Sequence, residues 1–207
     1  MDAEAVWHAI DEERRGLALL LDELTEEEWE TPSLCAGWRV REVAAHLTLA
    51  HTRPVRAVWD LLKAGGSFDR MIHDTAVRAA RRPVETYAED IRAMIGSRRK
   101  APGITHLEPL IDALVHGQDM AVPLGRERPM PVEPAMAAAD RVWTMGFPFH
   151  ARRTFAGLEL AATDCDWRVG SGRRIEGPIA GLLLLITGRG TVHPGLRGLR
   201  LSVGDGV

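Results

Sequence analysis

The sequence is poor in cysteine, with only Cys35 and Cys165 among its 207 residues. Two cysteines so far apart cannot build a disulfide framework or a Cys-x-x-Cys zinc site. Disulfides are rare in reducing compartments, so this scarcity favours a reduced, cytoplasmic protein. The amino-terminal segment is acidic and amphipathic, unlike the basic start and apolar stretch of a signal peptide. We therefore expect a cytoplasmic location.

Long apolar runs and a basic excess are also missing. The longest apolar run, residues 179–186, is far shorter than the roughly 20 residues that span a bilayer. The formal net charge is -3, whereas a protein that neutralises nucleic-acid phosphates needs a basic excess. The basic clusters are short, as is typical of a solvated surface: 81–82, 98–100, 152–153 and 173–174. The sequence thus predicts neither a membrane nor a nucleic acid as partner.

Apolar residues make up 45% of the sequence, enough for a proper core. Up to about residue 145 they recur with helical spacing. This pattern predicts helices over residues 2–24, 38–62, 67–81, 83–95, 109–121 and 135–145. A short helical turn is expected from residue 25. Asp2 fits an N-cap, and Thr25 with Glu28 fits a capping box. We expect Pro54 to kink or break its helix, and Pro83 and Pro109 to take first helical positions.

The period of the apolar pattern changes near residue 150. Residues 158–163 and 167–170 are typical of short strands, joined as a hairpin by residues 164–166. A short apolar helix over 178–186 and a last strand over 199–203 complete this part. The fold class is therefore mainly α, with a helical bundle over 1–148 and a small α+β domain over 149–207.

The predicted helix at 109–121 carries Asp112 and His116 four residues apart, on one helical face. A carboxylate oxygen and an imidazole nitrogen held this way can bind one divalent ion, each about 2.0–2.2 Å from it. Two ligands are an incomplete set, and His46, at the edge of another helix's apolar stripe, is the candidate third. We predict a three-ligand metal site between two helices, open to a substrate as catalytic metal sites are.

Each of these residues also has an ordinary structural interpretation. His46 alone fits a hydrogen-bonded histidine at a helix edge. Asp112 and His116 alone fit a solvated polar face shared with Asp119, which either orients His116 or faces water. For Cys35, inert packing is favoured over a reactive thiol.

Three parts of the sequence stand in a suggestive order: TPSLCAGWRVREVAAHL at 31–47, DALVHGQD at 112–119, and a tail with AATDCDWRVG at 161–170 and LLLLITGR at 182–189. Together they resemble the mycothiol-dependent maleylpyruvate isomerase family, part of the DinB-like metalloprotein superfamily. The resemblance covers nearly the whole chain. It implies a DinB-like four-helix bundle that holds one divalent metal, commonly zinc, with water or a thiol cofactor in the open positions.

Carried over residue by residue, the resemblance implies His46, Asp112 and His116 as metal ligands and Arg189, of the C-terminal domain, as a residue that assists the reaction. The chain departs from the family pattern in three ways. Asp112 stands where Glu or His is usual, and its arm is shorter. Arg39 stands where Ser or Thr usually caps the helix. The chain stops at Val207, so a truncated C-terminal domain is expected.

The function implied is a metal-dependent enzyme that uses mycothiol or a similar small thiol to isomerise a small electrophilic substrate, or that leaves the thiol attached to it (S-transfer). The first step of both reactions is the same, so the site does not distinguish them. A non-catalytic metal-binding or regulatory module is the alternative. A third interpretation, based on the C-terminal tail, is a carrier of apolar ligands. The sequence leaves the substrate, the thiol, the metal and the oligomeric state open.

Overall fold

The structure is a computed structural model that describes residues 1–49, 68–101, 103–189 and 195–198. The predicted kink at Pro54, the helix continuing to residue 62 and the strand at 199–203 lie outside these residues. The chain forms two compact units, Met1–Pro129 and Met130–Val207. The sequence placed the boundary at 148, after the last predicted helix of the bundle. That helix packs against the apolar helix of the tail instead, which joins it to the C-terminal unit.

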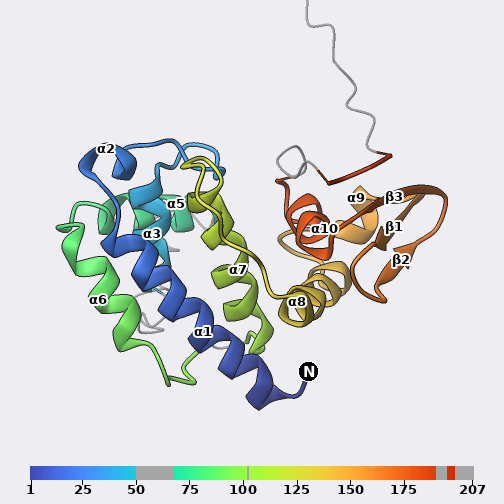
Figure 1. The fold of residues 1–207 in the computed structure, drawn as a ribbon, viewed down its shortest axis with the longest axis horizontal. Helices are drawn as coiled ribbons and strands as arrows, with labels where there is room; N and C mark the ends of the chain where they lie inside the picture. The colour runs from blue at the N-terminus through green and yellow to red at the C-terminus, as the bar shows by residue number, and fades with distance from the viewer. Residues whose placement is uncertain (50–67, 102, 190–194, 199–207) are drawn as a thin grey trace, which may run out of the picture. The chain divides into compact units, whose positions relative to one another are not determined.

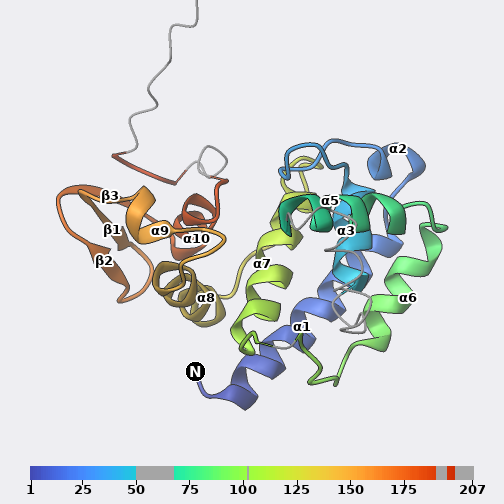
Figure 2. The same cartoon turned by 180° about the vertical axis from the view of Figure 1, so that it is seen from behind.

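The N-terminal unit contains α1 (Ala3–Asp22), α2 (Glu26–Trp29), α3 (Val40–Thr48), α5 (Phe68–Ala79), α6 (Glu85–Ala93) and α7 (Leu107–Ala121). Helix α1 packs against α6 and α7, and α3 packs against α5, α6 and α7 (Figures 1 and 2). The predicted four-helix bundle is therefore confirmed as α1, α3, α6 and α7. Its core includes Leu17, Leu21, Trp29, Val43, Tyr87, Ile91 and Met120.

The starts of α1 and α2 follow the predicted capping chemistry, whereas Pro83, predicted at a first helical position, precedes α6, whose N-cap is Val84. Asp2 accepts the N–H of Ala5 at 2.8 Å. Thr25 and Glu28 form the reciprocal capping box that the sequence predicted. Helix α3 lacks a Ser or Thr cap, and the carboxylate of Glu42 reaches back instead to accept the backbone N–H of Arg39 at 2.8 Å. The side chain of Glu42, in the first turn, thus supplies the capping hydrogen bond that the side chain of Arg39 does not.

Pro109 does not take the first helical position, so that prediction was wrong. Helix α7 begins at Leu107, which makes Pro109 its third residue. The N–H groups of the first helical turn have no intrahelical acceptor, so a proline there removes no helical hydrogen bond. The earlier start is compatible with the hydrogen bond from the Thr105 N–H to Glu108 at 2.7 Å.

The C-terminal unit contains α8 (Val132–Thr144), α9 (Ala151–Thr154), β1 (Leu158–Ala162), β2 (Arg168–Gly170), β3 (Arg173–Gly177) and α10 (Ile179–Ile186). The predicted hairpin is present as antiparallel β1 and β2. Strand β3, which the sequence did not predict, pairs parallel with β1, giving the order β2-β1-β3. Helix α10 packs against α8 and contacts β1 and β3. The small α+β domain is thus confirmed.

Two glycines let the chain cross from β2 to β3 over the start of β1. Gly170 and Gly172 have φ angles of 78° and 120°. A Cβ atom at either position would lie 2.2 Å from a backbone oxygen, that of Leu158 or of Gly157. No side chain fits such an approach, so the crossover requires glycine.

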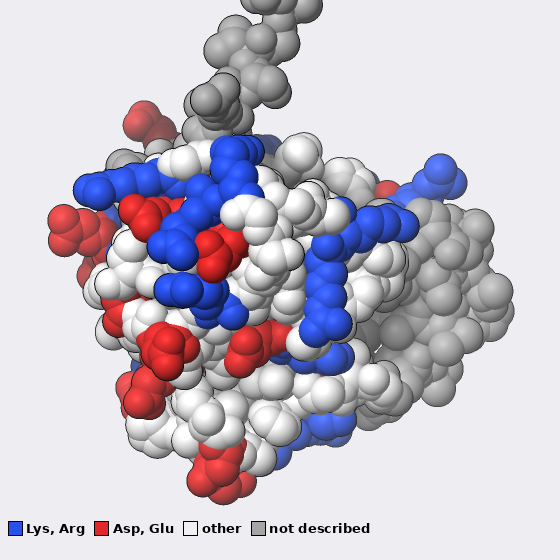
Figure 3. All heavy atoms as spheres, turned by 90° about the vertical axis from the view of Figure 1, so that its right-hand side faces the viewer, with Lys and Arg blue, Asp and Glu red and all other residues white. Residues whose placement is uncertain are grey.

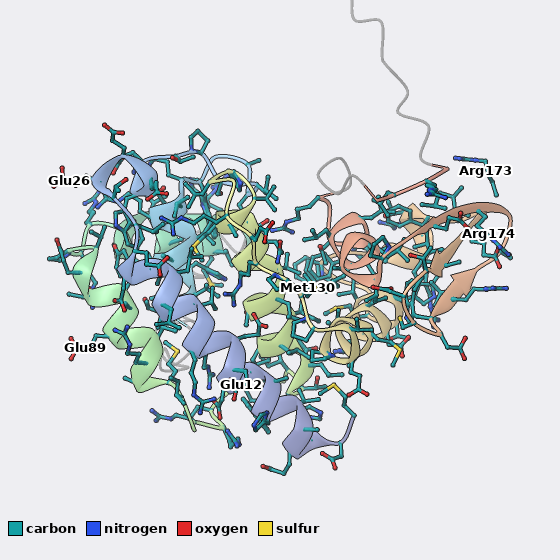
Figure 4. The ribbon with its side chains drawn as sticks, in the orientation of Figure 1. Glu12, Glu26, Glu89, Met130, Arg173 and Arg174 are labelled. Atoms are coloured by element: carbon teal, nitrogen blue, oxygen red, sulfur yellow. The ribbon has the colours of Figure 1, made fainter. Side chains whose placement is uncertain are left out.

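The short basic clusters predicted as solvated surface are exposed: 81–82, 98–100, 152–153 and 173–174. On the face shown in Figure 3, Lys and Arg side chains interleave with Asp and Glu. In Figure 4, Arg173 and Arg174 lie at the outer edge of the sheet, and Arg174 pairs with Glu159 at 2.8 Å. Within the described ranges, no helix has the length and apolar character needed to cross a bilayer.

Candidate metal centre

The packing of α3 against α7 brings the three predicted ligands together. One ligand atom each of His46, Asp112 and His116 lies within 4.8 Å of the other two. The imidazole rings of His46 and His116 meet edge to face, with centroids 4.9 Å apart. The spacing along α7 aligns Asp112 with His116, and the helix pairing, which the sequence does not encode by spacing, adds His46.

The geometry and chemistry of these donors fit one divalent ion. Ligands about 2.0–2.2 Å from a shared ion are at most about 4.4 Å apart, so small side-chain shifts would suffice. Two imidazoles and a carboxylate are donors that zinc accepts. The two histidines are partly buried and Asp112 is exposed. An ion held here would therefore keep one side towards solvent.

Asp119 contacts His116 and does not face water. Its side chain is fully buried, and its Oδ2 lies 2.8 Å from Nδ1 of His116. The Cys35 thiol donates to the same carboxylate oxygen at 3.0 Å and lies 3.8 Å from His116 Nδ1. The sequence favoured inert packing for Cys35, because nothing in the spacing connects residue 35 with α7. The structure gives its thiol polar partners instead.

Trp38 covers the two histidines from the loop that precedes α3. Its side chain is buried, and its ring centroid lies 5.3 Å from that of His46 and 6.4 Å from that of His116. Its indole N–H donates to Nδ1 of His73 at 2.9 Å. His73 is on α5 and has no sequence spacing to the other histidines, so sequence reasoning left it unassigned.

The pKa values of the two histidines are shifted in opposite directions. Burial, together with the positive charge of His116, lowers the pKa of His46 to about 3. Burial alone would also lower the pKa of His116, but hydrogen bonds with Asp119 and Cys35 and the charge of Asp112 raise it to about 10. At neutral pH, His46 therefore offers a lone pair, and His116 is a cation paired with Asp119. An ion that binds here must displace a proton from His116.

Arg189 follows α10 in the C-terminal unit. Its backbone N–H donates to the carbonyl of Leu184 at 2.7 Å, and its guanidinium donates to the carbonyl of Thr187 at 2.6 Å. These contacts satisfy carbonyls at the end of α10. They assign no chemical role, so the participation of Arg189 in a reaction stays a prediction.

Comparison with known proteins gives one family. Residues 10–107 match the model of the mycothiol maleylpyruvate isomerase N-terminal domain. The crystal structure of the mycothiol-dependent maleylpyruvate isomerase superposes with a TM-score of 0.64 and 14% identity, over 95% of this chain and 92% of that one. A mutant of that enzyme, with a histidine replaced by alanine, gives 0.62 and 15% over the same shares. A search among curated proteins finds no match.

These two solved structures share the fold of both units, since the superposition spans nearly all of each chain. The family match covers most of the N-terminal unit, including His46, Trp38 and Cys35. Residues 10–107 are thus similar to the N-terminal domain of mycothiol maleylpyruvate isomerase, and the chain shares the fold of that solved enzyme.

Proposed function

We propose that this protein is a metal-dependent enzyme that uses a low-molecular-weight thiol, mycothiol or a similar molecule, to isomerise a small electrophilic substrate. The observation that carries the proposal is the convergence of His46, Asp112 and His116. The match of residues 10–107 to the mycothiol maleylpyruvate isomerase N-terminal domain supports the thiol and the reaction class. Zinc is the metal that we propose, and the cytoplasm, where small thiols stay reduced, is the proposed location.

Isomerisation by a thiol requires no net redox change. The thiol sulfur adds to one carbon of a conjugated double bond, the remaining single bond rotates, and the thiol leaves as the double bond re-forms. Transfer of the thiol to the substrate begins with the same addition but ends before the departure. S-transfer is therefore the alternative reaction within this proposal, and identifying the product distinguishes it from isomerisation.

The residues of the chain have separate roles in this reaction. His46 and His116 hold the ion with Asp112, whose exposure leaves the solvent side open to thiol and substrate. The ion would supply a Lewis acid that favours the thiolate form of a thiol. Trp38 shields the two imidazoles on the loop side. We further propose that Arg189, whose guanidinium stays charged at neutral pH, assists the reaction as the family resemblance implies.

Elemental analysis of the native protein beside a His46→Ala, His116→Ala double variant tests the metal site. We expect about one equivalent of metal in the native protein and almost none in the variant, since three protein ligands are reduced to one. A matched His8→Ala, His106→Ala variant, which removes two histidines outside the cluster, should keep its metal. Equal metal in the native protein and the first variant would eliminate the site.

A non-catalytic metal-binding or regulatory module is the second candidate. The shorter arm of Asp112, compared with a glutamate, favours this function over a tight catalytic site. Assays of metal-loaded protein with thiols and conjugated electrophiles separate the two. Thiol-dependent isomerisation or conjugation that disappears in the His46→Ala, His116→Ala variant supports the enzyme. A metal-loaded protein without turnover supports the module.

A further inference from the structure

We propose that Cys35 and Asp119 are positioning residues for the metal centre, which fix the ring of His116 by hydrogen bonds and do not themselves bind the ion. The inference rests on the proposed metal site. His116 Nδ1 lies 2.8 Å from Asp119 Oδ2, and the Cys35 thiol donates to the same oxygen. With Nδ1–H donating to Asp119, Nε2 is the nitrogen that remains for the ion.

The distances distinguish this arrangement from a second metal site. Cys35, His116 and Asp119 also form a group whose ligand atoms lie within 4.8 Å of one another. Ligands in a tetrahedral shell about 2.0–2.2 Å from a zinc ion are about 3.3–3.6 Å apart. The separation of 2.8 Å between His116 Nδ1 and Asp119 Oδ2 is shorter than that and matches a charge-assisted hydrogen bond. The group is therefore a hydrogen-bonded unit.

Asp119 connects the loop before α3 to α7 through both its backbone and its side chain. The backbone carbonyl of Asp119 accepts the N–H of Leu34 at 3.1 Å, and its buried side chain accepts the Cys35 thiol. The hydroxyl of Ser33 accepts the N–H of Cys35 at 3.1 Å and donates to the carbonyl of Trp38 at 2.9 Å. The orientation of His116 thus depends on the loop that also places Trp38 over the site.

The zinc affinities of matched variants, measured by competition with a chelator, test the proposal. We expect Asp119→Asn to weaken zinc binding by about 10–100-fold, the usual effect of removing an outer-shell carboxylate. Cys35→Ala should weaken it by a smaller factor, up to about tenfold. Cys35→Ser keeps a hydroxyl donor and should stay within about threefold of the native protein. Cys165→Ser, which changes the other cysteine, is the matched control.

Two spectroscopic readouts separate positioning from a purely structural role. In the zinc-loaded native protein, nitrogen-15 NMR should show His116 protonated at Nδ1, and this N–H signal should shift in both Asp119→Asn and Cys35→Ala. In the cobalt-substituted protein, Cys35 should give no thiolate charge-transfer band. A band that is present in the native protein and absent in Cys35→Ser would overturn the proposal, because Cys35 would then be a ligand.

The outcomes also separate this inference from the proposed function. Zinc affinities of Asp119→Asn and Cys35→Ala equal to the native value would overturn the positioning role and leave the enzyme proposal intact. The expected losses of affinity, in a protein without turnover with any thiol, would support positioning and contradict the enzyme. A native protein that binds no divalent metal would overturn both. Circular dichroism of each variant excludes loss of folding as the cause, and Cys35→Ala, compared with Cys35→Ser, provides the test if Asp119→Asn does not fold.

Discussion

Asp112 is the proposed ligand that packing constrains least, because its side chain is exposed while the two histidines are partly buried in the bundle. We expect Asp112→Asn to weaken zinc binding by more than about 100-fold, since a neutral amide replaces an anionic ligand and first-shell losses exceed the roughly 10–100-fold of outer-shell changes. Asp112→Glu keeps the charge and lengthens the arm, so its affinity should equal or exceed that of the native protein. Chelator competition measures both.

Asp166→Asn is the control for these two variants, because it neutralises an exposed aspartate of the C-terminal unit. A native-like zinc affinity in Asp112→Asn would remove this residue from the ligand set. In that case the two histidines alone would have to hold the ion, and the open coordination positions would be more numerous than proposed.

At the scale of single residues, the sequence predicted the three proposed ligands but not their surroundings. Asp112 and His116 lie on one helix, so their spacing determines that they share a face. Cys35 and Trp38 reach the site through the path of a loop, and His73 through the placement of α5. Loop paths and helix placements depend on tertiary packing, which no local spacing encodes.

Helix α3 carries His46, and Glu42 stabilises its start. Glu42 is buried, and burial raises its pKa, but hydrogen bonds from the guanidinium and the backbone N–H of Arg39 outweigh this and lower the pKa below the ordinary 4.5. A depressed pKa stabilises the folded state above the unfolded value. This stability is lost as the pH falls through the lower folded value.

Glu42→Gln should therefore lower the free energy of unfolding by about 1–2 kcal/mol near neutral pH, through the loss of the cap and of the charge-assisted bonds. The difference from the native protein should shrink once the pH falls below the lowered pKa of folded Glu42, where native Glu42 also becomes protonated. Urea unfolding at the two pH values measures this. Glu89→Gln, on the exposed face of α6 (Figure 4), should show little change at either pH. A pH-independent difference for Glu42→Gln would contradict the assignment.

At the scale of elements, local sequence signals predicted where α1 and α2 begin, but they did not predict which charged residues are buried. Charged residues 11–14 interrupt the apolar stripe of α1 in the sequence, yet Asp11, Glu13 and Arg14 are buried. Arg14 donates to Asp11 at 3.2 Å and to a backbone carbonyl after α6 at 2.7 Å. The partners of a buried charge come from elements distant in sequence, so the pattern of one helix cannot reveal them.

The ion pair of Glu13 also depends on residues distant in sequence, among them two glycines. It pairs with Arg128 at 2.5 Å, and the Arg128 side chain passes close to Gly16 and Gly117. A Cβ atom on Gly117 would lie 2.6 Å from Arg128 Nε. The sequence shows a glycine inside a helix next to His116, but only the structure explains it, as the space that a crossing arginine needs.

For the whole molecule, the change of apolar period near residue 150 indicated two parts correctly but did not identify the partner of α8. Helices with similar apolar stripes fit a bundle equally well in sequence terms. The packing of α8 against α10 depends on the very apolar surface of α10, whose residues from Ile179 to Ile186 are almost all buried. The units therefore divide after Pro129, and all three proposed ligands belong to the first.

This division predicts how metal binding affects thermal unfolding. An ion that binds only folded Met1–Pro129 stabilises this unit by about 2.7 kcal/mol at a free concentration of a hundred times Kd. For a unit of this size, that corresponds to a rise in Tm on the order of 10 °C. Because the C-terminal unit has its own core and no proposed ligand, calorimetry should show a second transition whose Tm does not change with zinc.

The His46→Ala, His116→Ala variant should lose the zinc-dependent shift and keep both transitions, because neither histidine belongs to the hydrophobic core. The Tm of the first transition should fall, since the variant removes the histidine partner of the buried Asp119 carboxylate. A single transition that shifts as a whole on adding zinc would show instead that the two units unfold together. A zinc-dependent shift confined to the C-terminal transition would place the ion outside α3 and α7 altogether, and the proposed assignment of His46, Asp112 and His116 as ligands could not stand.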